Sequence, residues 1–220
     1  MMVLQVTPLP ATLPVIRRKT SADVPAVVQV HMHSFSGFFL TVLGAPFLRE
    51  LYMATLADRD GIGFVAENEK DVCGFVTGTA QPAGFYRRLL RQRWWRFAGA
   101  AALPALRQPT IIPRLLRAIS MPEQVTRQPG RGTLMSIGVL PEAQGKRIGQ
   151  ALVRAFLEEA ARRGLLQVDL TTDRDNNEAT NCFYQKLGFV CERTFTTPEG
   201  RAMNEYVIDL AGWEPAHRIN

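Results

Sequence analysis

The sequence predicts a mixed α/β domain, because segments with two-residue hydrophobic alternation and segments with helical periodicity follow one another along most of the chain. A length of 220 residues suits one domain, and 46% hydrophobic with 21% charged residues is typical of a folded globular protein. The predicted order is strand, helix, helix, strand, strand, insertion, strand, helix, strand, helix and two strands. We treat this as one domain over residues 1–220.

The amino-terminal third begins with a short predicted strand at residues 15–18. Polar residues then offer helix caps before a helical stretch that runs to His33. Glycines interrupt the next apolar stretch, and Pro46 begins a second helix whose apolar residues share one face. Two strands, Gly63–Glu67 and Val72–Ala80, form a predicted hairpin across a polar turn.

An insertion is predicted at Gln81–Gly132, where the composition changes. No acidic residue occurs between Asp71 and Glu123, and arginines gather there beside Trp94 and Trp95. Four prolines are expected to divide the insertion into short helices: Pro104, Pro109, Pro113 and Pro122. We favour a lid over the acceptor site or a homodimer contact. A membrane surface is the next interpretation, since basic and aromatic residues suit it, and nucleic acid is the least favoured.

Regular alternation resumes after the insertion. The predicted elements are a strand at Thr133–Leu140, a helix at Gly145–Arg163, a strand at Gln167–Thr171, a helix at Glu178–Leu187, and a closing hairpin of Phe189–Thr196 and Met203–Leu210.

The net charge of +6 favours anionic ligands without choosing among them. The three cysteines, Cys73, Cys182 and Cys191, are an odd number without metal-ligand spacing, so we expect reduced thiols and no metal. No uncharged apolar run reaches the roughly 18 residues of a membrane-spanning helix. We therefore expect a cytoplasmic location.

The segment from Ser136 to Leu152 carries the first chemical motif, a strand that passes through the tight turn Gln144–Gly149 directly into a helix. Backbone N–H groups at a helix start have no intrahelical partners, and the helix dipole adds positive potential there. Glycines at 145 and 149 let an anion approach the backbone closely. The turn therefore indicates an anion site such as one for a pyrophosphate.

A second motif follows at Asn177–Phe189, a short amphipathic helix closed by Gly188 and Phe189. Together the two motifs resemble the acyl-CoA-binding signature of the GNAT superfamily of N-acetyltransferases. The specific part of the resemblance covers residues 134–190. It implies a twisted, mostly antiparallel sheet flanked by helices, splayed near its middle, with acetyl-CoA between the fourth and fifth strands.

The resemblance also assigns roles in holding acetyl-CoA. The turn would bind the diphosphate, the backbone of Ile137 and Val139 would bind the pantetheine arm, and the Asn177 amide would assist. The implied contact residues are Ile137, Val139, Gln144, Gly145, Lys146, Arg147, Ile148, Gly149, Gln150 and Asn177. Arg147 departs from the family pattern, which usually has glycine there. Its Cβ could push the diphosphate outward, or its guanidinium could pair with a phosphate.

For the chemical step, the resemblance places Tyr184 beside the thioester sulfur, where a phenol with a pKa of about 10 can protonate the departing thiolate. The acceptor amine also needs a base. The family often has a carboxylate on the strand before the turn, but residues 134–137 offer only the hydroxyl of Ser136. We name His31 and Glu205 as candidates. His33, Glu67 and Asp173 are left open.

A weak resemblance of His31–Gly44 and of the insertion to family members encoded with surface-polysaccharide enzymes favours an amino-sugar acceptor, nucleotide-linked or free. Protein N-termini and other small amines are left open, as is a non-catalytic CoA-binding module. We expect direct transfer in a ternary complex, because no cysteine has an evident activating partner. Four charged residues are interpreted as solvated loop charges rather than a metal cluster: Asp169, Asp173, Arg174 and Asp175.

Overall fold

Seven strands form one mixed sheet in the computed structural model, which describes residues 14–69, 71–107, 128–211 and 213. The strands are β1 (Val15–Arg18), β2 (Gly61–Asn68), β3 (Asp71–Thr79), β4 (Arg131–Val139), β5 (Gln167–Asp173), β6 (Val190–Thr196) and β7 (Ala202–Asp209). Their order is β1-β2-β3-β4-β5-β7-β6. Every neighbouring pair is antiparallel except β4 and β5, which are parallel. The expected mixed, mostly antiparallel sheet is confirmed.

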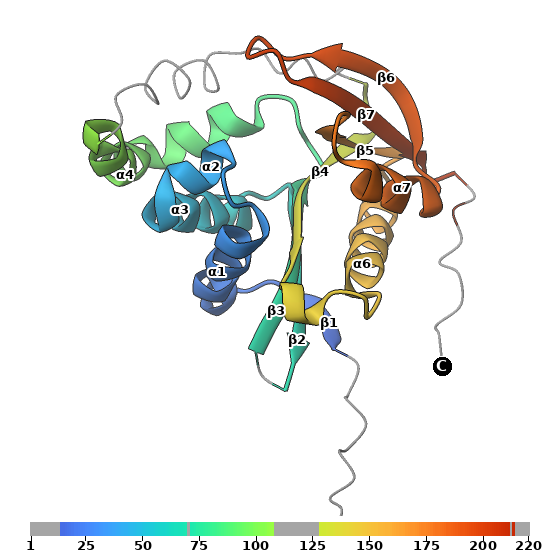
Figure 1. Cartoon of the computed structure of the whole chain (residues 1–220), viewed down its shortest axis with the longest axis horizontal. Coiled ribbons are helices and arrows are strands. Elements are labelled where there is room, and N and C mark those ends of the chain that lie inside the picture. Colours follow the sequence, from blue (N-terminus) through green and yellow to red (C-terminus); the bar gives the residue numbers. More distant parts are fainter. Residues whose placement is uncertain (1–13, 70, 108–127, 212, 214–220) are drawn as a thin grey trace, which may run out of the picture.

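Helices cover both faces of this sheet (Figure 1). They are α1 (Val24–Ser34), α2 (Phe39–Val42), α3 (Gly44–Ala57), α4 (Phe85–Arg107), α6 (Ile148–Arg162) and α7 (Glu178–Lys186), with single 3₁₀ turns at Ser21–Asp23 and Pro141–Ala143. The helices α1 to α4 lie on one side of the central strands, and α6 and α7 lie on the other (Figure 1). The boundary between the central strands β4 and β5 therefore lies between the two layers of helices.

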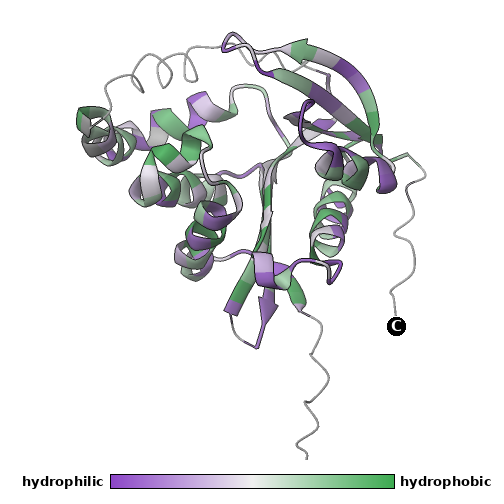
Figure 2. Cartoon of the chain, in the orientation of Figure 1, coloured by the Kyte–Doolittle hydropathy of each residue, from purple (hydrophilic) through white to green (hydrophobic). Residues whose placement is uncertain are grey.

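Hydrophobic side chains from each layer form separate cores. The largest joins α6 and α7 to the sheet and includes the fully buried Leu152 and Phe156. A second joins α1 and α3 to the opposite face and includes Tyr52 and Phe75. A third joins α3 to α4. Figure 2 shows the central strands as mostly hydrophobic and the helices as carrying both kinds of residue, which is the pattern of helices buried on one face.

The strands β4 and β5 separate soon after they begin. They pair at three positions only: Arg131 with Gln167, Gly132 with Val168, and Thr133 with Asp169. Beyond Thr133, β4 continues to Val139 paired with β3 alone, while β5 continues paired with β7. The sheet is therefore splayed at its middle, as the family resemblance implied.

The helix after the Gln144–Gly149 turn begins at Ile148, three residues later than the predicted start at Gly145. The backbone explains this difference. Gly145 has φ +79° and Arg147 has φ +58°, which lie in the left-handed region and cannot belong to a right-handed helix. Residues 145–147 are thus a turn that leads into α6.

The prediction that Pro104 ends a helix within the insertion is wrong. The helix α4 runs from Phe85 to Arg107 with Pro104 inside it, and its break in helical geometry is at Arg93, with φ −141° and ψ 24°. Proline removes one N–H donor and clashes with the carbonyl four residues earlier, yet the helix continues through Pro104 to Arg107, the last residue described in this segment. Pro109, Pro113 and Pro122 lie outside the described residues.

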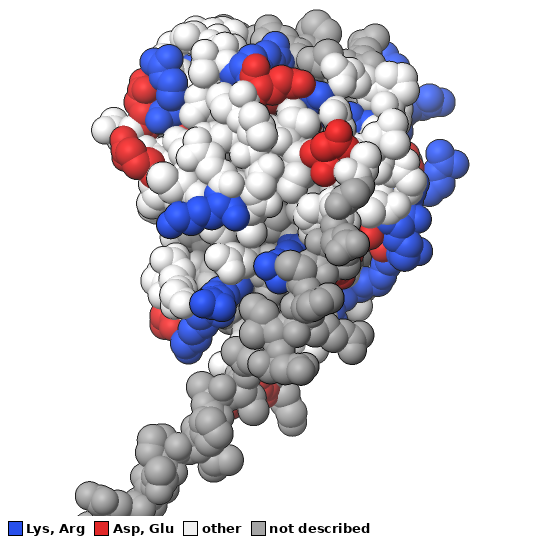
Figure 3. All heavy atoms as spheres, turned by 90° about the vertical axis from the view of Figure 1, so that its right-hand side faces the viewer, with Lys and Arg blue, Asp and Glu red and all other residues white. Residues whose placement is uncertain are grey.

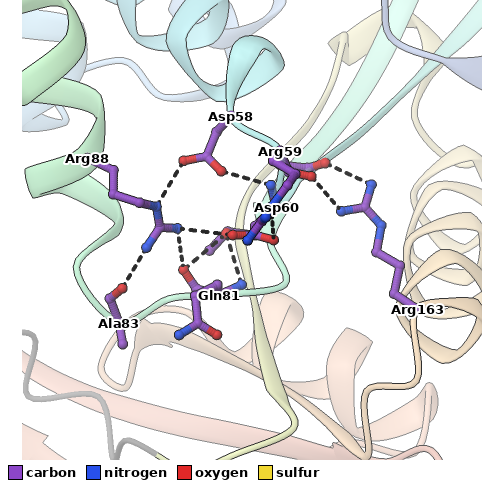
Figure 4. Close-up of polar contacts among 9 residues, drawn as sticks. Asp58, Arg59, Asp60, Gln81, Ala83, Arg88 and Arg163 are labelled. Atoms are coloured by element: carbon purple, nitrogen blue, oxygen red, sulfur yellow. Dashed lines mark hydrogen bonds and ion pairs between the residues drawn. The ribbon is translucent and has the colours of Figure 1, made fainter.

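The start of α4 is tied to the loop between α3 and β2 (Figure 4). The Arg88 guanidinium donates to Asp58 Oδ2 at 3.2 Å, to the Ala83 carbonyl at 2.6 Å and to the Gln81 carbonyl at 2.7 Å. Arg163, beyond the end of α6, donates to the Gly61 carbonyl at 3.0 Å from the other side of the same loop. The insertion is therefore anchored to the body of the domain.

Candidate active site

A cavity of about 440 Å³ occupies the opening between β4 and β5. Residues from β4, β5, α7 and the end of α1 form its walls. They are Ser34, Phe35, Phe38, Leu134, Met135, Ser136, Ile137, Gly138, Val139, Gln144, Leu170, Thr171, Thr172, Asp173, Asn177, Thr180, Tyr184, Arg201 and Met203. We call this cavity the cleft. Its mixture of apolar and polar walls suits an extended polar ligand.

The edge of β4 that faces the cleft carries backbone groups that are not paired with β3. Leu140, just after β4, donates its N–H to the Cys73 carbonyl of β3 at 2.9 Å. Successive residues of a strand turn their backbone groups to opposite edges, so those of Val139 and Ile137 turn toward the cleft. The Val139 carbonyl already accepts from the Gln144 side chain at 3.2 Å and from Ser34 at 3.4 Å. The cleft can therefore bind an amide-containing chain in the manner of a strand.

The Gln144–Gly149 turn follows β4 after the 3₁₀ turn at Pro141–Ala143. No side chain caps the amino terminus of α6, so its first N–H groups are available to an anion. Ile148 is 4% exposed and fixes the helix start in the main core, while Lys146 and Arg147 are exposed beside it. A Cβ at Gly149 would lie 3.4 Å from the Phe183 ring, which is ordinary van der Waals contact, so the Phe183 ring of α7 lies next to this turn. The turn combines backbone donors with two cations.

The left-handed backbone at Arg147 explains why the family pattern usually has glycine there. Glycine adopts a positive φ freely, whereas another L-residue there costs roughly 1 kcal/mol. Arg147 keeps this conformation and places its guanidinium at the surface of the turn. Its departure from the pattern therefore leaves the shape of the turn intact.

Tyr184 lies on α7 and lines the cleft with an exposure of only 4%. Edge-on contacts hold its ring between Phe183, at 5.1 Å between centroids, and Phe189, at 5.6 Å. Burial raises the pKa of its phenol above the ordinary value, so the hydroxyl keeps its proton at neutral pH. The residue can therefore serve as a proton donor to a group in the cleft.

Asn177 precedes α7 and also lines the cleft. Its amide Nδ2 donates to the Asp173 carbonyl at 3.1 Å, which fixes the turn between β5 and α7. Asn181, one turn later, donates to the same carbonyl at 3.1 Å and accepts from Thr172 at 2.6 Å. These bonds fix the carboxyl end of β5 to the start of α7 on one wall of the cleft.

The two candidate bases lie off the cleft wall. His31 on α1 is 2% exposed, and burial lowers the pKa of its imidazole to about 4. Glu205 on β7 is also 2% exposed, and it is hydrogen-bonded by Arg193 and lies 4.0 Å from Arg131. Neither side chain reaches the cleft directly, and the catalytic roles of both residues stay predictions.

The interpretation of Asp169 as a solvated loop charge is wrong. Asp169 lies on β5, is 3% exposed, and accepts a hydrogen bond from Thr133 at 2.6 Å, while its Oδ2 has no partner. Burial raises the pKa of this carboxyl to about 6. Asp173 ends the same strand. Among the described residues, no group of histidine, cysteine and acidic side chains could hold a metal ion.

Sequence reasoning missed one charged pair at the cleft. Arg201 donates to both oxygens of Asp173, at 2.7 Å and 2.6 Å, and its guanidinium lies 5.6 Å from the centre of the Phe38 ring. All three residues line the cleft. The position of Arg201 beside the turn of the last hairpin was the only signal in the sequence, and it does not indicate which strand end the side chain meets.

Comparisons with known proteins agree with this geometry. A model of the acetyltransferase (GNAT) family matches residues 26–189, which is most of the chain. The chain belongs to the GNAT family of acetyltransferases. The match includes every element that forms the cleft up to α7, so the resemblance carried by the two motifs is confirmed.

Curated relatives share a short part of the sequence of this GNAT acetyltransferase. A mycothiol acetyltransferase of Paenarthrobacter aurescens is 47% identical over 62 residues, which are 28% of this chain and 19% of the relative. One of Kocuria rhizophila is 41% identical over 61 residues. The matches span about one fifth of the length of these relatives, so they support the shared motifs rather than a shared substrate.

Solved structures share the fold of this acetyltransferase. The PaiA N-acetyltransferase of Thermoplasma acidophilum in complex with coenzyme A has a TM-score of 0.52 and 16% identity, covering 87% of this chain and 97% of that one. An N-acetyltransferase of Staphylococcus aureus has a TM-score of 0.59 and 18% identity, covering 90% and 98%. Both likenesses concern the fold alone.

The surface of this acetyltransferase mixes charges. On the face that carries α6 and α7, basic side chains are spread widely and acidic ones lie among them (Figure 3). None of the described helices is long and apolar enough to cross a membrane.

Proposed function

We propose that this acetyltransferase transfers the acetyl group of acetyl-CoA directly to the primary amine of a small acceptor, with an amino sugar as the favoured class. One observation carries the proposal. The cleft brings an open strand edge and a buried tyrosine together, and the uncapped start of α6 follows shortly after Gln144, which lines the cleft. Acyl transfer from a thioester needs binding contacts to each part of the coenzyme and an acid near its sulfur.

The residues present fit acetyl-CoA. The N–H groups at the start of α6, with Lys146 and Arg147 beside them, suit the diphosphate. The outward-facing backbone of Ile137 and Val139 suits the amides of the pantetheine arm, and Asn177 lies across the cleft from them. Gln144 and Ser34 both donate to the Val139 carbonyl, so the pantetheine arm would replace at least one of them. Bound acetyl-CoA supplies an activated acyl group.

The chain then provides groups for charge and proton transfer. A backbone N–H on the free edge of β4 is placed to stabilise negative charge on the acyl oxygen. The Tyr184 hydroxyl, kept protonated by burial, donates its proton to the departing sulfur. Leu134, Leu170 and Met203 exclude water from this part of the cleft. No cysteine lines the cleft, which favours direct transfer over an acetyl-cysteine intermediate.

Hydroxyl groups and aromatic rings in the cleft support a hydroxylated acceptor. Ser34, Ser136 and Thr171 offer groups that both donate and accept hydrogen bonds, and aromatic rings of Phe35 and Phe38 lie beside them. Sugar rings combine hydroxyl edges with apolar faces, which this wall matches. The net charge of +6 also favours a nucleotide-linked form of the acceptor.

Replacing Tyr184 tests this function. We expect Tyr184→Phe to lower kcat by about 100-fold with little change in the KM for acetyl-CoA, because the acid is lost and the ring is kept. The assay measures acetylation of glucosamine, a nucleotide-linked amino sugar, spermidine and a short peptide. Tyr206→Phe is the matched control, since Tyr206 is 1% exposed and does not line the cleft.

Two results would change the proposal. If the wild type binds acetyl-CoA but acetylates none of these amines, the chain is a non-catalytic coenzyme A-binding module. If the peptide is acetylated and both sugars are not, the acceptor class is wrong while the transfer reaction stands.

A further inference from the structure

The cleft has an acid, but no carboxylate on its β4 wall to take the proton of the acceptor amine. Ser136 is the only residue of positions 134–137 with a titratable or exchangeable side-chain proton, and it lines the cleft. A serine hydroxyl is a poor base by itself, since its oxygen can take a proton only while it passes its own proton on. Ser136 can therefore act as a base only if a second group can accept its proton.

Tyr52 is the group that contacts Ser136 from the core. This residue lies on α3, is 1% exposed and packs in the core between the helices and β3. Its hydroxyl is within hydrogen-bonding reach of the Ser136 hydroxyl, and that contact favours the ionised phenol. Burial outweighs the contact and raises the pKa of the Tyr52 phenol, so Tyr52 passes protons without becoming an anion.

His31 lies behind Tyr52. Its Nδ1 is 2.6 Å from the Tyr52 hydroxyl, and its ring is enclosed by Phe35 at 4.7 Å and Phe75 at 6.3 Å between centroids. Its Nε2 is buried without a hydrogen-bond partner. Leaving a buried ring nitrogen unpaired costs roughly 1–3 kcal/mol, so packing alone gives no reason for a histidine here.

The three groups form a directional chain. With the ring hydrogen on Nε2, Tyr52 donates to His31 Nδ1, which leaves the Tyr52 oxygen able to accept from the Ser136 hydroxyl beside it. The lone pairs of the Ser136 oxygen are then free to accept from a group in the cleft. Burial keeps the pKa of His31 at about 4, so its Nδ1 is unprotonated and able to accept at neutral pH.

We propose that Ser136, Tyr52 and His31 form a proton relay that takes the proton of the acceptor amine from the cleft into the core. The proposal rests on the proposed acetyl transfer. As the amine nitrogen bonds to the acyl carbon and the carbon–sulfur bond breaks, one amine proton moves to Ser136 Oγ. The Ser136 proton moves to Tyr52, and the Tyr52 proton moves to His31 Nδ1. Tyr184 gives its proton to the sulfur, and both ends are reset after product release.

The charges around the relay keep the imidazolium short-lived. The Lys19 ammonium lies 5.1 Å from the centre of the Tyr52 ring and 3.4 Å from Thr77 Oγ1, and it is partly balanced by Asp23. Burial lowers the pKa of Lys19 to about 8, so it is mostly charged at neutral pH. A cation beside Tyr52 opposes a second positive charge in the relay, and burial, which lowers the pKa of His31, drives the proton back out.

Conservative variants test the relay. We expect Tyr52→Phe and Ser136→Ala each to lower kcat by about 10- to 100-fold, with the KM for acetyl-CoA changed by less than about twofold. Ser136→Thr should recover most of the activity, because it restores the hydroxyl. Thr55→Val is the matched control, since Thr55 lies one turn further along α3, is 4% exposed, and donates only to the Leu51 carbonyl at 2.8 Å.

The measurement uses the amine of the panel that the wild type acetylates fastest, and each variant is checked for wild-type binding of coenzyme A. The relay is overturned if Tyr52→Phe and Ser136→Ala keep the kcat of Thr55→Val, or if Ser136→Thr is as slow as Ser136→Ala. In both cases the proposed function stands, because the wild type and the Tyr184 variant still differ. A wild type that acetylates no amine overturns both proposals.

Discussion

At the scale of single residues, Arg147 shows how a departure from a family pattern can keep the backbone that the pattern encodes. The position needs a positive φ, and Arg147 adopts +58°. Its side chain is exposed beside the turn, so it adds a cation without filling the space above the N–H groups of α6. Backbone strain and charge can therefore be separated by mutation.

Two substitutions of Arg147 make this separation. We expect Arg147→Gly to stabilise the fold by about 1 kcal/mol, because the left-handed strain is removed, and Arg147→Ala to leave stability nearly unchanged. Both should weaken coenzyme A binding by about 3- to 10-fold, because both lose a charge-assisted contact to a phosphate. Urea unfolding and calorimetric titration measure these effects. Unchanged coenzyme A affinity in both variants would show that the guanidinium does not contact the phosphates.

The environment of Asp169 cannot be predicted from the residues next to it in the sequence. Asp169 lies between Val168 and Leu170 in β5, and all three residues are buried, so the alternation expected of a strand does not explain the burial of its carboxyl. Only the pairing of Thr133 with Asp169, across 36 positions of sequence, buries the carboxyl. The same holds for Ser136, Tyr52 and His31, which come from three elements.

At the scale of elements, α4 depends on its anchor. Its α3-facing side packs in the third core, and Arg88 ties its first turns to Asp58 and to two carbonyls (Figure 4). Trp94 and Trp95, just after the Arg93 kink, are 65% and 58% exposed. This exposure fits each interpretation of the insertion that we favour, a lid or a homodimer contact, and also a membrane surface.

We expect Arg88→Ala to loosen α4 without unfolding the domain, because three hydrogen bonds at its start are lost and each contributes about 1 kcal/mol. Cleavage by chymotrypsin at the aromatic residues of α4 should then be about 10-fold faster. Arg91→Ala is the control, since Arg91 is an exposed residue of the same helix. Equal cleavage rates in the two variants would mean that the third core alone holds α4.

The order of elements was largely predictable, because hydrophobic periodicity reports which face of a strand or helix is buried. Periodicity does not report how a backbone turns, so the start of α6 at Ile148 and the kink at Arg93 were not predicted. The turn before α6 and the helix α7 followed from local motifs. The contacts of His31 and Tyr52 could not be predicted, because these residues meet only through the packing of α1 and α3.

At the scale of the whole molecule, buried ion pairs join distant parts of the chain. Glu159 on α6 is 4% exposed, and its Oε2 accepts from Arg18 of β1 at 2.6 Å while Arg163 donates to Oε1 at 2.8 Å. Burial opposes the charge of Glu159, but hydrogen bonds from three arginines outweigh it and lower its pKa to about 2. Asp23, bound by Arg17, likewise has a pKa of about 2.

These values set the response of stability to pH. A carboxyl whose pKa is lower in the folded chain stabilises the fold above its unfolded pKa, near 4.5 for Glu159, and this contribution is lost as the pH falls toward 2. Asp169 acts in the opposite sense. Its pKa of about 6 exceeds the unfolded value of 3.8, so its protonation stabilises the fold as the pH falls between those values. Stability should therefore hold to about pH 5 and fall steeply below 4.5.

Glu159→Gln tests this account. We expect the variant to be less stable than the wild type by about 2 kcal/mol at pH 7, because three guanidinium groups lose their anion. The difference should shrink as the pH falls from 4.5 toward 2, since the wild-type carboxyl is then protonated as well. Urea unfolding at pH 7, 4 and 3 measures it. A difference that stays constant over this range would mean that Glu159 stabilises the fold through packing rather than charge.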